Sequence, residues 1–112
     1  MSPEIAWNNI IRNLRGKSIE LPTVPKIKKI PVWFSASTDG NMIFIDKASK
    51  NQPSSKLSMI RKLTYKIFQK VYPLYIKREQ GESVSIEVTR LTVNQVYYFS
   101  LMHHLSKKEV DA

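Results

Sequence analysis

The first regular pattern along the chain is a helical one at the N-terminus. Ser2 is a helix-capping residue type, Pro3 suits a first helical position, and Gly16 suits the end of a helix. Between them, apolar side chains recur every three or four residues, at Ile5, Trp7, Ile10, Ile11 and Leu14. The spacing predicts a helix over about 3–15.

A proline-punctuated connector follows. Lys17–Leu21 is extended in character, and Pro22, Pro25 and Pro31 exclude a central strand because proline donates no ladder hydrogen bond. The same connector carries three basic residues, Lys26, Lys28 and Lys29.

Two β-rich runs then flank a turn sequence. Ile30–Phe34 and Met42–Ile45 are separated by Ser37–Asn41, which contains Asp39 and Gly40. Glycine accepts positive φ, and aspartate bonds its own local backbone. The pattern predicts an antiparallel β-hairpin, followed by a polar loop over Ser49–Ser55.

An amphipathic helix is predicted over Leu57–Gln80. One arc of its helical wheel is apolar and holds Ile60, Leu63, Ile67, Phe68, Val71, Leu74 and Tyr75. Another arc is basic and holds Lys62, Lys66, Lys70 and Lys77. Pro73 removes a helical hydrogen bond, so we expect the helix to kink or restart there and to form two pieces.

The C-terminal part gives one ambiguous pattern and one clear one. Ser83–Thr89 alternates with period two and favours a strand, with a short helix as the alternative. Thr92–Gln95 fits a capping box and predicts a last helix to about residue 105. The fold class is therefore α+β: an N-terminal helix, a β-hairpin with one or two added strands, and a mainly helical C-terminal half. We expect a single domain over residues 1–112.

Composition narrows the classes of protein. The chain has 112 residues and no cysteine, which excludes disulfides, thiolate catalysis and cysteine-ligated metals. The N-terminal residues do not resemble a secretory signal, and no apolar run is long enough to span a bilayer. We expect a soluble, cytoplasmic protein.

Basic charge is concentrated in one segment. The net charge is +9, from 18 basic and nine acidic residues. Lys47–Arg78 contains nine basic residues and no acidic one, so this segment alone accounts for the net charge. A local positive field attracts phosphates or acidic protein surfaces.

Catalytic motifs are weak. His103 and His104 are the only histidines, and adjacent helical residues do not converge on one metal ion. A nuclease would need acids near a lysine, and Asp39, Asp46 and Lys47 are the only candidates that hairpin geometry offers. Their spacing is better explained by turn and strand-end roles. We predict no enzymatic activity, no cofactor and no metal.

Two further interpretations concern nucleic acid. Glu82–His104 has the length of a helix-turn-helix whose second helix bears Asn94, Gln95 and Tyr98, although a terminal helix packed into the core fits the spacing better. Tyr65 and Tyr72 flank the basic arc, where aromatic rings could stack on unpaired bases.

These observations favour a small non-enzymatic basic protein that binds nucleic acid, with DNA slightly favoured over RNA. The predicted phosphate-binding residues belong to the lysine-rich helix and the loop before it: Lys47, Lys50, Lys56, Arg61, Lys62, Tyr65, Lys66, Lys70, Lys77 and Arg78. The alternative is an accessory subunit or interaction module that docks on an acidic partner, with Trp33 and Tyr98 as apolar anchors. A small metal-dependent nuclease is the third hypothesis. The sequence leaves oligomeric state and sequence specificity undetermined.

Overall fold

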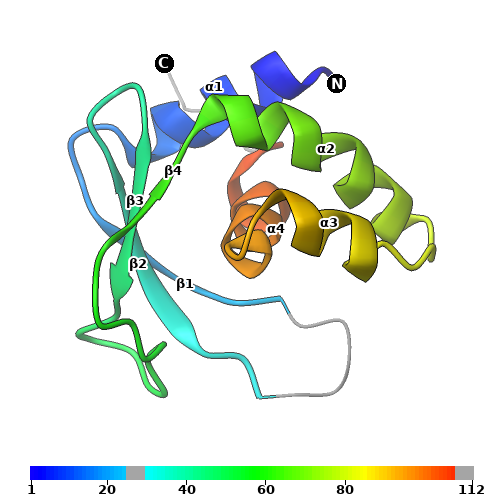
Figure 1. Cartoon of the computed structure of the whole chain (residues 1–112). Helices are drawn as coiled ribbons and strands as arrows, with labels where there is room; N and C mark the ends of the chain where they lie inside the picture. Colours follow the sequence, from blue (N-terminus) through cyan, green and yellow to red (C-terminus); the bar gives the residue numbers. More distant parts are fainter. Residues whose placement is uncertain (25–29, 108–112) are drawn as a thin grey trace.

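The computed structural model describes residues 1–24 and 30–107, so the connector residues Lys26, Lys28 and Lys29 lie outside the described part. Its elements are α1 (Pro3–Leu14), β1 (Ile19–Pro22), β2 (Trp33–Thr38), β3 (Ile43–Lys47), β4 (Arg61–Leu63), α2 (Tyr65–Glu79), α3 (Ser85–Leu91) and α4 (Gln95–Leu105). The strands form an antiparallel sheet in the order β1-β2-β3-β4. The helices of this α+β fold gather on one side of that sheet (Figure 1).

A hairpin across the Asp39–Gly40 turn is confirmed, but the predicted pairing of Ile30–Phe34 with Met42–Ile45 is wrong. The partners of Ile43, Phe44 and Ile45 are Thr38, Ser37 and Ala36, which lie closer to the turn. β2 and β3 pair from Thr38 opposite Ile43 to Phe34 opposite Lys47, whereas Ile30 lies outside β2 and is 81% exposed. The turn sets this register. The Asp39 carboxylate accepts the backbone N–H groups of residues 41 and 42 at 2.9 and 2.8 Å, so pairing starts directly beside the turn.

The predicted helix over Leu57–Gln80 is shorter than expected, because its first part is a strand. β4 pairs with β3, and α2 starts only after Thr64, whose hydroxyl accepts the N–H of Ile67 at 3.4 Å. The expected break at Pro73 is also wrong. Val71 and Tyr75 on either side of it are both buried in the core, and this shared packing keeps α2 continuous.

The strand predicted over Ser83–Thr89 is wrong, and the alternative of a short helix is correct. A strand would place Val84, Ile86 and Val88 on one face. In the observed helix, Val84 at the N-cap of α3 and Val88 are both buried, four residues apart, while Ile86 is 68% exposed. The helix therefore buries the two side chains that can reach the core.

The last helix ends as expected at Leu105, but the predicted capping box is absent. Asn94 is the N-cap and makes no side-chain cap hydrogen bond; instead its backbone N–H donates to the Thr92 hydroxyl at 3.0 Å. Most of α4 is buried between the sheet and the other helices. No helix in the described ranges is both long enough and apolar enough to cross a membrane.

A candidate nucleic-acid interface on α2

The exposed side of α2 carries a lysine stripe, which we define as Lys66, Lys70 and Lys77. All three side chains are exposed. At about 100° per residue they fall within an arc of about 40°, and they span about 16 Å along the helix axis. The opposite side of α2 buries Phe68, Val71 and Tyr75. Core packing therefore forces the stripe into solvent.

Among the residues that the structure describes, no acidic side chain forms an ion pair with the stripe. Glu79 is the only acid in α2, and its carboxylate lies 3.8 Å from the guanidinium of Arg78. In the part of the chain that the structure describes, Lys66, Lys70 and Lys77 form no ion pair. Their charges are available to a ligand.

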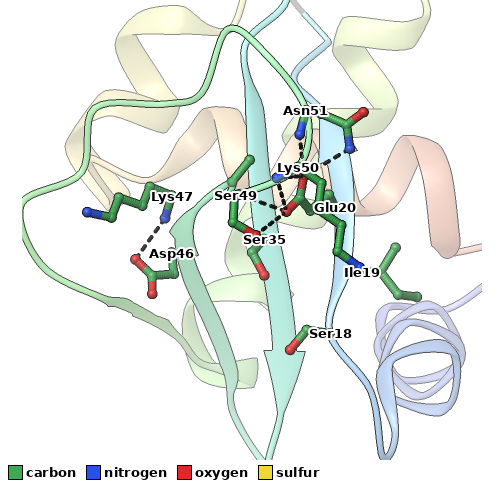
Figure 2. Close-up of a pocket in the computed structure, with 10 residues that line it drawn as sticks. Ser18, Ile19, Glu20, Ser35, Asp46, Lys47, Ser49, Lys50 and Asn51 are labelled. Atoms are coloured by element: carbon green, nitrogen blue, oxygen red, sulfur yellow. Dashed lines mark hydrogen bonds between the residues drawn. The ribbon is translucent and has the colours of Figure 1, made fainter.

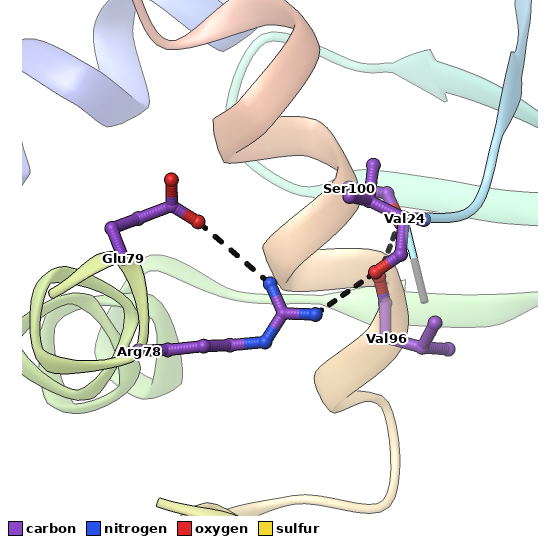
Figure 3. Close-up of polar contacts among 5 residues, drawn as sticks. All are labelled: Val24, Arg78, Glu79, Val96 and Ser100. Carbon is purple, nitrogen blue, oxygen red and sulfur yellow. Dashed lines mark hydrogen bonds and ion pairs between the residues drawn. The ribbon is translucent and has the colours of Figure 1, made fainter. Parts of the chain in front are cut away.

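Arg78 faces inward, unlike the stripe. Its side chain is only 11% exposed, and it donates to the backbone carbonyl of Val24 at 3.0 Å (Figure 3). The guanidinium carbon lies 4.9 Å from the centre of the Phe99 ring, and the Val24 N–H donates to the Ser100 hydroxyl at 3.1 Å. Arg78 therefore ties the segment that follows β1 to α2 and α4, which makes it a structural residue.

The two basic residues of β4 are also separated from the stripe. Arg61 is half-buried and donates to the Asn94 side-chain carbonyl at 2.7 Å. Lys62 is exposed and lies opposite Phe44, on the face of the sheet away from the helices. The prediction that both residues lie on a helix is wrong, because they belong to strand β4.

The predicted loop lysines form a group of their own. Lys47 ends β3, and Lys50 and Lys56 lie in the segment between β3 and β4. All three are exposed. Figure 1 shows this loop at one end of β4 and α2 at the other, so the backbone that carries these lysines is separated from α2 by the length of β4.

The loop is held in place by Glu20, a residue that sequence reasoning missed. Its carboxylate accepts backbone N–H groups from Ser49, Lys50 and Asn51 at 2.8 to 3.2 Å, together with the Ser49 hydroxyl and the Asn51 amide (Figure 2). These hydrogen bonds, with the Ser49 N–H first among them, lower the pKa of Glu20 to about 2. No local pattern marks Glu20, because its partners lie 29 to 31 residues away.

The two tyrosines proposed to stack on bases pack against the protein itself. The Tyr65 ring lies 6.0 Å from Trp7, and the Tyr72 ring lies 6.0 Å from Phe68. The Tyr72 hydroxyl donates to the backbone carbonyl of Met1 at 2.8 Å. Both rings are half-buried against the protein, so neither is a fully exposed platform for base stacking.

Helices α3 and α4 are joined by three residues, as in a helix-turn-helix, but α4 is not available to read DNA. Tyr98 is 2% exposed, and its hydroxyl accepts the Thr64 N–H at 3.1 Å. The Asn94 side-chain carbonyl accepts a hydrogen bond from the Arg61 guanidinium. The prediction of a terminal helix packed into the core is confirmed, and Tyr98 is excluded as an anchor for a partner protein.

The residues considered for metal or nuclease chemistry do not converge. Asp39 lies in the hairpin turn, whereas Asp46 lies near the other end of β3, opposite Ser35. The His104 ring contacts the Pro22 carbonyl at 2.9 Å, while His103 is exposed. Across the described ranges, no group of three or more acidic or histidine side chains could hold a metal ion.

Comparisons of the chain with protein-family models, curated proteins and solved structures give no match.

Proposed function

We propose that this protein is a non-enzymatic nucleic-acid-binding protein that contacts the phosphate backbone through the lysine stripe of α2. The observation that carries the proposal is the alignment of three exposed lysines on one arc of a helix whose opposite side is fixed in the core. Within residues 1–24 and 30–107 these lysines form no ion pair. Aligned ammonium groups on a rigid element bind phosphates without an ordering cost for the backbone.

The proposal is narrower than the footprint predicted from sequence. Arg61 and Arg78 are excluded because their guanidinium groups bind other parts of the protein. Tyr65 is excluded because its ring packs on Trp7. Lys62 is exposed on the other face of the sheet and is, at most, an extension of the interface.

A pair of matched variants tests the proposal. The helix variant reverses the stripe (Lys66→Glu, Lys70→Glu and Lys77→Glu), and the loop variant reverses Lys47, Lys50 and Lys56 to Glu. Both variants change the net charge equally, and all six side chains are exposed. Affinity for a labelled DNA duplex is measured by fluorescence anisotropy over a series of salt concentrations, with a folded acidic protein as competitor.

For the wild type we expect a salt slope of about −3, from about 0.9 counterions released at each of three phosphate contacts. The helix variant should abolish this slope, and the loop variant should keep most of the affinity. The labelled duplex should remain intact when magnesium is added. Equal losses in both variants would show only generic attraction, and displacement of the duplex by the acidic protein would favour the accessory-subunit hypothesis.

The helix variant should remain folded. Glutamate at position 66 is favourable in the first turn and glutamate at position 77 is unfavourable in the last, so their interactions with the helix dipole oppose each other. Thermal unfolding followed by circular dichroism provides the control.

A further inference from the structure

The surroundings of the lysine stripe indicate which form of nucleic acid it suits. The inference rests on the proposed function and concerns whether the nucleic acid is double-stranded or single-stranded. Both forms present the same phosphate chemistry, but they need different surfaces from a protein.

Surfaces that bind single strands combine positive charge with aromatic rings on which successive bases stack. The exposed surface of α2 lacks fully exposed aromatic rings for base stacking. The tyrosines nearest the stripe, Tyr65 and Tyr72, are half-buried against Trp7 and Phe68. Between Lys70 and Lys77, the exposed side of the helix offers Pro73 and Ile76 and no aromatic ring. A single strand would therefore gain charge contacts alone and would still have to be ordered.

A duplex needs no aromatic platform. Its phosphates form a regular array with one charge per about 1.7 Å of axis, on a rod that is stiff over about 50 nm. The helix that carries the stripe is held in place by buried side chains along its length and by Arg78 near its end, so the three lysines project from a fixed backbone. Lysine ammonium groups act as point charges and lack the forked geometry that reads base edges.

We infer that the α2 lysine stripe binds the backbone of double-stranded nucleic acid in preference to single strands, and independently of base sequence. The aromatic side chains that are partly exposed elsewhere, Trp33 and Phe44, lie on the far face of the sheet. That face carries the acidic residues Glu20 and Asp46, but it also carries Lys62 directly opposite Phe44, so it is the surface on which a single strand would compete with the stripe.

The test compares one 20-nucleotide DNA strand, its duplex, and an RNA duplex of the same sequence, all at one salt concentration. We expect the DNA duplex to bind about fourfold more tightly than the single strand at about 0.1 M salt, because each of three contacts releases about 0.9 counterions from a duplex and about 0.7 from a single strand. Duplexes rich in A·T and in G·C pairs should bind equally. The affinities for the DNA duplex and the RNA duplex show which of the two kinds of nucleic acid the stripe prefers.

The outcomes separate this inference from the proposed function. Tighter binding of the single strand, with affinity lost in Phe44→Ala or Trp33→Ala, would overturn the duplex preference. Unchanged duplex binding in the helix variant would instead overturn the proposed function. A duplex preference that disappears in the helix variant, and persists in Phe44→Ala, supports both.

Discussion

The Tyr98 hydroxyl joins α4 to the point where β4 becomes α2. It accepts the Thr64 N–H at 3.1 Å and lies 3.4 Å from the Thr64 carbonyl, to which it donates. Tyr98 itself is 2% exposed. Replacing Tyr98 with Phe removes only the hydroxyl oxygen, so the packing of the ring is retained while the Thr64 N–H loses its acceptor.

The cost follows from the burial of that N–H group. An unsatisfied buried donor costs about 1–3 kcal/mol of stability. Thr64 is only half-buried, so water can replace part of the lost hydrogen bond, and we expect the free energy of unfolding to fall by about 1–2 kcal/mol. At about 4 °C per kcal/mol for a domain of this size, the melting temperature should fall by about 4–8 °C. Thermal unfolding by circular dichroism, with urea unfolding as a second measurement, gives this value directly.

Tyr72→Phe is the matched control, because it removes the same atom from a hydroxyl that donates to Met1 in an exposed hydrogen bond. This variant should change stability by about 0.5 kcal/mol or less. If the two variants melt at the same temperature, the Tyr98 hydroxyl does not hold the junction and the reasoning is wrong.

Two further predictions concern long-range contacts. Because the folded pKa of Glu20 is lowered to about 2 from 4.5, its carboxylate contributes stability that is complete above about pH 4.5 and is lost as the pH falls toward 2. Urea unfolding at a series of pH values should therefore show a stability difference between the wild type and Glu20→Gln that shrinks over this range; a difference that is constant with pH would contradict this role. Arg78→Ala should destabilise the fold by about 1–3 kcal/mol by leaving the Val24 carbonyl unpaired, whereas Lys77→Ala next to it should cost about 0.5 kcal/mol or less. Equal melting temperatures for these two variants would show that Arg78 is not structural.

Elements with local stop and start signals were predictable from the sequence. The Ser2 hydroxyl accepts the Ile5 N–H at 3.2 Å and starts α1 as expected, and Gly16 follows its end with a φ of 73°. Asp39 and Gly40 form the expected hairpin turn. In each case the interaction that defines the element lies within a few residues of it, so the sequence pattern contains the whole signal.

The short segments were decided only by the tertiary structure. Arg61–Leu63 fits a helical wheel and also fits a strand, and it becomes β4 because β3 offers a free edge beside it. Ser83–Thr89 alternates like a strand but has no strand partner, so packing of Val84 and Val88 selects a helix. A segment of three to seven residues is too short to distinguish the helical period from the strand period, so the neighbouring elements decide which structure it adopts.

The same division applies to the candidate interface. The sequence determined that positive charge is concentrated between Lys47 and Arg78, and that Lys66, Lys70 and Lys77 lie opposite an apolar arc. Only the tertiary structure decided that Arg61 and Arg78 face protein partners, because Asn94 and Val24 are distant in sequence. Charge is a property of each residue, whereas its availability to a ligand depends on which distant groups the fold brings within hydrogen-bonding distance.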